Sequence, residues 1–133
     1  MAATFAGYVQ NHCLVGVCHS ISHALGKLGM SHGNLNLNLI NHVIEYNSNE
    51  PSVRDKYHQL FKNSGFGSTD EALKFFEWML SNLKKKGPEP NVINDMLTDD
   101  LITEILEDKL TDVNPVKPDA DAIKRIIKNA YEN

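Results

Sequence analysis

Apolar residues recur three and four positions apart along most of this 133-residue chain, and glycine, proline or a capping residue separates one apolar run from the next. Such spacing places the apolar side chains on one face of an α-helix. Residues 122–131 show it most clearly, and Pro51–Ser64 adds a proline at its start and Gly65 as a stop. We therefore expect an all-α fold of six or seven short helices, packed as a single domain over residues 1–133.

Further boundary signals separate the expected helices. Ser68–Glu71 is a capping-box sequence, and the helix that follows it should end before Gly87-Pro88. Thr98 is placed to cap the next helix. Ala2–His12 has helical spacing but no capping residue or lead-in, as expected if the chain is truncated at its N-terminus.

The segment Asn34–Asn47 fits two patterns. Over residues 35–39 leucines alternate with asparagines, which is the period of a strand, whereas residues 39–44 have helical spacing. The pattern favours a helix and leaves the strand open.

Charge and composition exclude several classes of function. The net charge of −4 and the pI near 5.8 argue against a nucleic-acid partner, and the short basic run Lys84–Lys86 fits the end of a helix. No apolar run approaches the roughly 18 residues of a membrane span, and the N-terminus lacks a signal peptide. Cys13 and Cys18 can form a disulfide, but two buried thiols in a reduced, cytoplasmic chain are the favoured state.

The chemically informative segment is a nearly all-apolar helix, Leu14–Leu25, that carries His19 and His23. Because they are four residues apart, the two imidazoles lie on one face, and we expect both to look into a pocket. His32 follows a glycine-containing turn that can fold it back over that face. Imidazole binds iron, zinc, copper and nickel. On spacing alone, however, buried and hydrogen-bonded core histidines are favoured over a metal site, and both interpretations stay open.

Other catalytic patterns are absent from the sequence. It contains no His-Glu-x-x-His, no Glu-x-x-His, no nucleophile elbow and no glycine-rich phosphate loop. Cys18 is not expected to act as a nucleophile with His19, since neighbours on a helix point about 100° apart. His12, His42 and His58 are expected to have structural or surface roles.

Gly16–Gly26, which includes His19 and His23, and the following His32-Gly33 closely resemble the signature of the iron-dependent (group III) alcohol dehydrogenases. Three flanking segments extend the resemblance over most of the chain: Ala2–Gly7, Asn41–Asn47 and Asn114–Tyr131. The resemblance implies the all-helical, metal-binding C-terminal domain of these enzymes, which is similar to the α domain of dehydroquinate synthase. It also implies that Asn34–Asn47 is a helix.

The resemblance further implies a reaction and a site. Enzymes of this family interconvert alcohols and aldehydes or ketones with NAD(P), which an α/β domain binds. A divalent metal, most often Fe²⁺ and sometimes Zn²⁺, lies between the domains and polarises the substrate oxygen while hydride passes to the nicotinamide. By position, His19 and His32 match metal ligands. His23 matches the histidine near the substrate and nicotinamide that assists proton movement.

Two departures from the family pattern limit what the chain can do alone. The Asp-x-x-x-His pair that supplies the other ligands is missing, as is the dinucleotide domain. We therefore expect NAD(P) only through that domain, and no turnover by the isolated chain. The spacing from His23 to His32 is one residue shorter than usual, which can move His32 by up to about 3 Å.

For partners, we expect an alcohol or aldehyde substrate in the full enzyme, a homo-oligomer or pairing with the missing domain, and neither nucleic acid nor membrane. Two other interpretations remain open. The chain can be a non-catalytic binding or assembly module derived from the family, since an apolar surface left by absent helices favours association. It can also be a structural domain whose histidines only pack in the core.

Overall fold

The computed structural model describes residues 1–82 and 90–131, and over these residues it contains helices and no strand. In chain order the helices are α1 (Ala2–Cys13), α2 (Val17–Gly26), α3 (His32–Asn47), α4 (Pro51–Asn63), α5 (Thr69–Asn82), α6 (Pro90–Met96), α7 (Asp99–Glu107), α8 (Lys109–Asp112) and α9 (Ala120–Tyr131). The all-α fold is therefore confirmed. The strand alternative for residues 35–39 is wrong, because His32–Asn47 is one helix, in which Leu35 and Leu39 pack in the core while Leu37 lines a cavity.

The helices outnumber the six or seven expected, because α6 and α8, of 7 and 4 residues, are too short to show a periodic pattern. α2 also begins at Val17 and not at the predicted Leu14. Leu14 has a positive φ of 59°, which breaks the helix there, and the Val17 N–H donates to Oδ1 of Asn114 at 3.2 Å. A side chain from a distant loop therefore sets the start of the helix that carries the histidines.

The predicted caps are present. The Glu71 N–H donates to Oγ of Ser68 at 3.1 Å, and the Glu71 carboxylate accepts from the Gly67 N–H at 2.7 Å, one residue before the expected partner. Thr98 Oγ1 accepts from the Leu101 N–H at the start of α7. The expected helix end at Gly87-Pro88 and the basic run Lys84–Lys86 lie outside the described residues.

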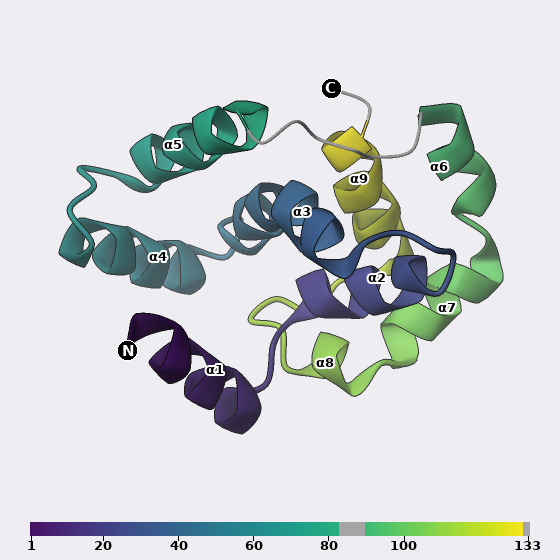
Figure 1. Cartoon of the computed structure of the whole chain (residues 1–133), viewed down its shortest axis with the longest axis horizontal. Coiled ribbons are helices and arrows are strands. Elements are labelled where there is room, and N and C mark those ends of the chain that lie inside the picture. Colours follow the sequence, from purple (N-terminus) through teal and green to yellow (C-terminus); the bar gives the residue numbers. More distant parts are fainter. Residues whose placement is uncertain (83–89, 132–133) are drawn as a thin grey trace.

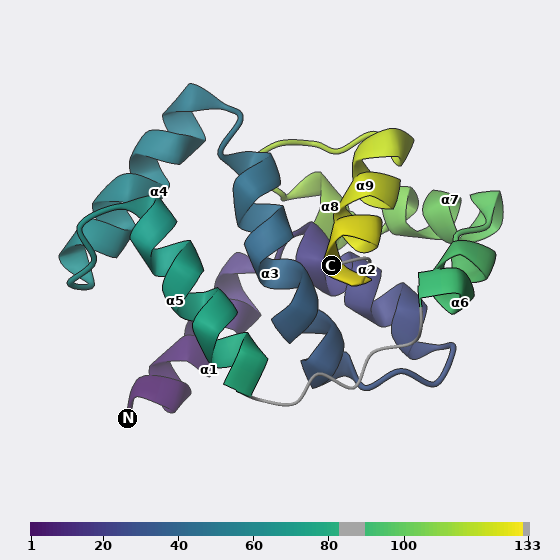
Figure 2. The ribbon, with the colours of Figure 1, turned by 90° about the horizontal axis from the view of Figure 1, so that it is seen from above.

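The main core lies where α2, α3 and α9 meet, on the side of the molecule that also holds α6, α7 and α8 (Figure 1, Figure 2). Apolar side chains from all of these helices except α8 form one buried cluster. Its fully buried members include Val17, Ile21, Leu25, Leu35, Leu39, Ile93, Ile105, Ile123 and Ile127. Each such side chain contributes about 1.5–3 kcal/mol through burial, so α2 is held firmly on this face.

A second cluster joins α4 and α5 to the far end of α3. Ile44, Phe61 and Ala72 are buried in it, and the partly buried Tyr57, Phe66, Leu73 and Phe76 surround them. These helices form a layer on the opposite side of α3 from the main core (Figure 2).

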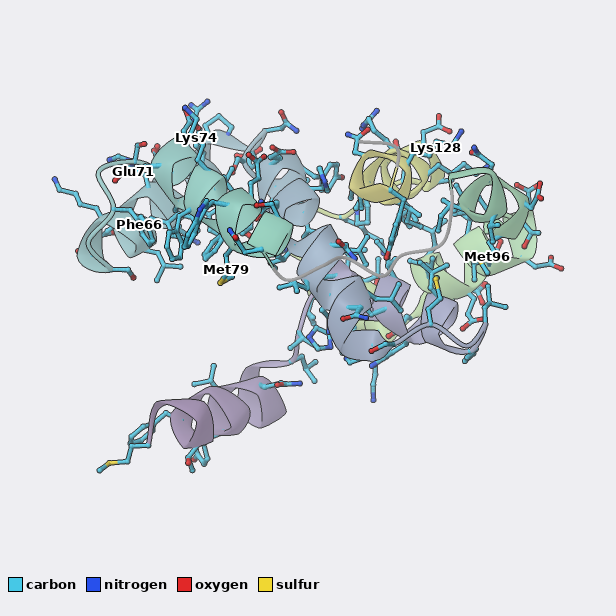
Figure 3. All side chains as sticks on the ribbon, turned by 45° about the horizontal axis from the view of Figure 1, so that its top comes forward. Phe66, Glu71, Lys74, Met79, Met96 and Lys128 are labelled. Carbon is cyan, nitrogen blue, oxygen red and sulfur yellow. The ribbon has the colours of Figure 1, made fainter. Side chains whose placement is uncertain are left out.

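The first helix extends away from both clusters. Figure 3 shows α1 apart from the rest of the ribbon, and Phe5 and Val9 on it are 67% and 54% exposed. In the described part of the chain, no helix is long and apolar enough to cross a membrane.

Candidate metal centre

His19 and His23 occupy one face of α2, one turn apart. The opposite face is fixed in the core by Val17, Ile21 and Leu25, so the two imidazoles must point away from the core. Their ring centroids are 6.0 Å apart. This arrangement follows from the i, i+4 spacing, as the sequence predicted.

The surroundings of these two rings differ from the prediction. His19 is half-buried and lines a cavity, but the side chain of His23 is 50% exposed and faces solvent. The expectation that both look into a pocket is therefore wrong for His23. Since neither residue is buried, the interpretation of both as core histidines is also contradicted.

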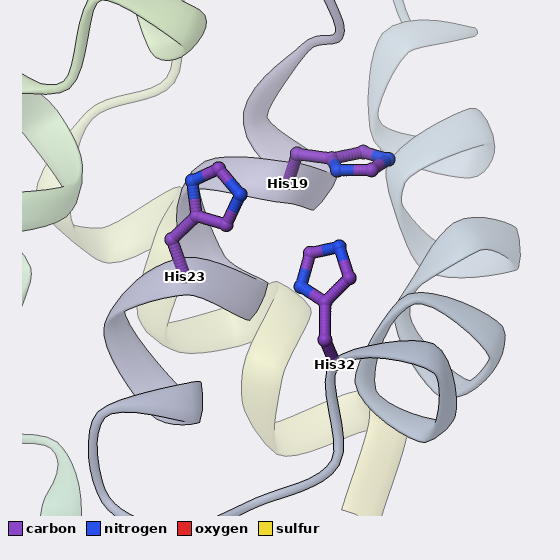
Figure 4. A group of neighbouring side chains, drawn as sticks. All are labelled: His19, His23 and His32. Carbon is purple, nitrogen blue, oxygen red and sulfur yellow. The ribbon is translucent and has the colours of Figure 1, made fainter. Parts of the chain in front are cut away.

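His32 completes a group of three imidazoles. It is the first residue of α3, and the turn that precedes it reverses the chain through Gly29, whose φ is 90°. The His32 ring centroid lies 5.0 Å from that of His19 and 5.2 Å from that of His23, and the rings surround a common space (Figure 4). The shortened loop therefore does not carry this ring away from the other two.

Two further residues, Asn36 and Asp108, contact the histidines, and a third, Ser22, contacts Asn36; sequence reasoning missed all three. Asn36, one turn beyond His32 on α3, has its amide Nδ2 3.0 Å from His32 Nε2. Its Oδ1 accepts a hydrogen bond from Ser22 Oγ on α2 at 2.6 Å. Asp108 has one carboxylate oxygen 4.0 Å from Nδ1 of His23, while its other oxygen accepts from the Leu110 N–H and caps α8.

The sequence contained only part of the signal for these three residues. Asn36 is i+4 from His32 and therefore on the same helical face, so the helix prediction for this segment could have found it. Asp108 comes from the junction of α7 and α8, far along the chain, and only the folded structure brings it to His23.

The local electrostatics favour a neutral His19. Partial burial, and then the charges that His32 and His23 carry when protonated, lower the pKa of His19 below its ordinary value of 6.5. A neutral imidazole has a free lone pair at pH 7, which metal binding requires. Beside it, burial raises the pKa of the Cys18 thiol to about 12, so this free, buried thiol is not a nucleophile. The side chain of Cys13, the other half of the possible disulfide, lies outside the described residues.

The three imidazoles suit a divalent transition metal. One nitrogen of each ring lies within 4.8 Å of the others, and two nitrogens bound to one zinc at about 2.1 Å can be at most about 4.2 Å apart. Small side-chain rotations would therefore bring them to a shared ion. In the described part of the chain, no other group of three or more histidine, cysteine or carboxylate side chains converges in this way.

A largely apolar cavity of about 500 Å³ adjoins this group between α2 and α3. His19, Gly33 and Asn36 form the wall nearest the histidines, and Leu37, Ile40 and Val43 line its apolar part. The cavity gives a small organic molecule a place to lie beside His19.

The remaining histidines are separate from this site. His42 pairs with Glu45 at 3.3 Å on the far side of α3, and His58 is exposed on α4, in agreement with the structural or surface roles predicted for them. The side chain of His12 lies outside the described residues.

Comparison with known proteins gives a consistent result. Residues 1–131 match the model of the Fe-containing alcohol dehydrogenase family, C-terminal. An alcohol dehydrogenase of Thermococcus barophilus is 29% identical over 98% of the chain and 35% of its own length. The bifunctional aldehyde-alcohol dehydrogenase AdhE of Escherichia coli K12 is also 29% identical, over 18% of its length. The chain thus spans about a third or less of these relatives.

A solved structure supports the fold. The iron-containing alcohol dehydrogenase of Thermococcus thioreducens superposes with a TM-score of 0.77 and 22% identity, over 89% of this chain and 32% of that one.

Proposed function

The chain belongs to the iron-containing alcohol dehydrogenase family, matching its C-terminal domain, and from this we propose that it supplies the metal-binding histidines of an NAD(P)-linked alcohol dehydrogenase. In this proposal His19 and His32 bind the metal, with Fe²⁺ preferred and Zn²⁺ as the alternative. The single observation that carries it is the convergence of three imidazoles from α2 and α3 on one space.

The bound metal would act as a Lewis acid on the oxygen of an alcohol or aldehyde substrate. The chain's own contributions are then distinct. His19, kept neutral by partial burial and by its two neighbours, offers a lone pair, and the adjoining cavity admits the substrate's carbon chain. His23 lies at the solvent side with the Asp108 carboxylate 4.0 Å from its Nδ1, a position suited to passing a proton between substrate and water.

The rest of the reaction needs groups outside this sequence. We propose that residues 1–133 form part of a helical C-terminal domain, that the further metal ligands lie on an earlier helix outside this sequence, and that the NAD(P) site lies on a separate dinucleotide domain. This follows from the share of the relatives that the chain covers. Alone, the chain would bind metal weakly, because two imidazoles leave most metal positions to water, and it would catalyse no turnover without the NAD(P) site.

Calorimetric titration of the chain with Zn²⁺, and with Fe²⁺ under anaerobic conditions, tests this proposal. We expect weak binding that His19→Ala and His32→Ala abolish, while the control His58→Ala, an exposed histidine on another helix, leaves it unchanged. An unaltered affinity in His19→Ala, or no binding by the wild-type chain, would contradict the proposed metal centre.

A second candidate function is a non-catalytic binding or assembly module. The observation that favours it is the apolar surface on α1 and α5, where Phe5, Phe75 and Trp78 are exposed. Mixing the chain with a separately produced dinucleotide domain of the family distinguishes the two. Recovered alcohol oxidation supports the enzyme, whereas stable self-association without activity supports the module.

A further inference from the structure

The cavity between α2 and α3 has a phenolic hydroxyl at the end far from the histidines. His19 and Asn36 line one end of it, near the start of α3, whereas Tyr57 lines it near Asn47, the last residue of α3. Asn36 and Asn47 are about 16 Å apart along the helix axis, at roughly 1.5 Å per residue. A molecule that reaches from the histidines to Tyr57 is therefore elongated.

A chain of hydrogen bonds determines where the hydrogen of the Tyr57 hydroxyl points. The Val17 N–H can only donate, and it donates to Asn114 Oδ1 at 3.2 Å, while the Val116 carbonyl can only accept, and it accepts from Asn114 Nδ2 at 2.7 Å. These two backbone groups fix the orientation of the Asn114 amide. Its Nδ2 also donates to Asn47 Oδ1 at 2.7 Å, so Asn47 presents its own Nδ2 to Tyr57.

The oxygen of Tyr57 must therefore accept a hydrogen bond from Asn47. The two atoms are 3.1 Å apart, and an amide Nδ2 can only donate, so the O–H hydrogen of Tyr57 points elsewhere. Over residues 1–82 and 90–131, this hydroxyl donates to no other protein group. The Tyr57 ring packs beside Phe61 in the second cluster, so the hydroxyl is the end that meets the cavity. Its hydrogen is available to a bound molecule.

We propose that Tyr57 is a specificity-determining residue, which donates a hydrogen bond to a neutral oxygen at the far end of an elongated alcohol or aldehyde substrate. The inference rests on the proposed function, which places the reacting end of that substrate beside His19. The apolar side chains of Leu37, Ile40 and Val43 line the cavity between the two ends and suit a hydrocarbon chain.

The lining of the cavity selects a neutral oxygen over an ionised group. Among the described residues that line it, none is an aspartate, glutamate, lysine or arginine, and partial burial lowers the pKa of His19. A carboxylate or an ammonium group at the Tyr57 end would lose its water without gaining an opposite charge, which costs more than one hydrogen bond returns. The substrate class is therefore a long-chain alcohol whose second oxygen belongs to an ester, a ketone or an ether.

The test uses methyl ω-hydroxydodecanoate with a ¹³C label at its ester carbonyl. Calorimetric titration of the metal-free chain gives the affinity, and the infrared band of the labelled carbonyl reports its hydrogen bonding, because a donor lowers the stretching frequency. Tyr57→Phe keeps the ring and removes the hydroxyl. This variant should bind the ester about 3- to 10-fold more weakly than the wild type, and its bound carbonyl should absorb at a higher frequency.

A second variant, Asn47→Asp, tests the orientation of the hydroxyl. A carboxylate at this position offers Tyr57 an acceptor oxygen in place of the amide N–H, so the hydroxyl turns its hydrogen away from the ligand although it is still present. If circular dichroism shows wild-type helix content, Asn47→Asp should match Tyr57→Phe in both readouts. The matched control is Tyr8→Phe, which removes the hydroxyl of an exposed tyrosine on α1 and should behave like the wild type.

Wild-type affinity and an unchanged carbonyl band in Tyr57→Phe would overturn the role of Tyr57, as would absence of ester binding by the wild-type chain. The proposed metal centre fails separately, through a zinc affinity that His19→Ala leaves unaltered. Because the ester titration contains no metal, the two failures are distinguishable.

Discussion

Gly16 has no room for a side chain, and this fixes the start of α2. A Cβ built on Gly16 would overlap Oδ1 of Asn114. That oxygen cannot move freely, because it accepts from the Val17 N–H and the same amide donates to Asn47 Oδ1 and to the Val116 carbonyl, both at 2.7 Å. The glycine is therefore required by a close approach and not by its backbone angles.

We predict that Gly16→Ala destabilises the chain by about 1–3 kcal/mol, the usual cost of overpacking. Urea unfolding followed by circular dichroism measures this as a lower midpoint. Gly26→Ala, at the end of the same helix with nothing within 4 Å of the added Cβ, is the control and should be neutral or slightly stabilising. Equal unfolding midpoints for the two variants would mean that the Asn114 side chain can move away from the added Cβ at little cost in free energy.

The buried Cys18 thiol gives a pH dependence. Its pKa rises from 9.0 to about 12 on folding, so the folded state keeps a proton that the unfolded state loses above pH 9. Stability is therefore full below pH 9 and falls as the pH rises toward 12. At pH 10.5 the loss should be about 2 kcal/mol.

Unfolding of the wild type and of Cys18→Ala, compared between pH 8 and pH 10.5, isolates this contribution from other titrating groups. The difference in free energy of unfolding between the wild type and Cys18→Ala should shrink or reverse as the pH rises. A difference that stays constant would show that the thiol is not shielded from solvent.

At the residue level, the sequence predicted which histidines come together but not the residues that surround them. His19, His23 and His32 could be selected because helical spacing and a short turn are local properties. The exposure of His23 could not be predicted, since it depends on which face of α2 the distant helices α7 and α8 cover. Asp108 and Asn114 act across the chain and left no local pattern.

At the scale of elements, the hydroxyl of Thr98 holds the start of α7. It accepts from the Leu101 N–H at 3.3 Å, and α7 packs against α2 and α9. We predict that Thr98→Ala lowers the free energy of unfolding by about 1 kcal/mol, whereas Thr98→Ser, which keeps the oxygen, has little effect. Chemical denaturation measures both, and an equal loss in the two variants would point to the methyl group instead.

Helix existence was predictable where apolar spacing and stop signals agreed, as in α4, α7 and α9. The short helices α6 and α8 were missed for a physical reason. They span only 7 and 4 residues, too few to show a periodic pattern. Asp108, which caps α8, comes directly after α7 in the sequence, so the two helices look like one segment.

At the scale of the whole molecule, α1 stands out because packing within a single chain does not account for its stability. It has 12 residues and none of them is charged. Isolated helices of about 12–15 residues are marginal in water. Phe5 and Val9 on it are nevertheless exposed, and the helix lies apart from the rest of the described chain (Figure 3). A helix of this kind is stabilised when another surface covers its apolar side.

We therefore predict that the chain self-associates through α1. Sedimentation velocity should show a mass that rises with concentration, and the double variant Phe5→Ser with Val9→Ser should remain monomeric. Leu28→Ser, a change of similar size at an exposed leucine in the turn after α2, is the control and should associate like the wild type. A wild-type chain that stays monomeric at every concentration, with α1 readily cleaved by protease, would show instead that this surface has no partner in a second copy.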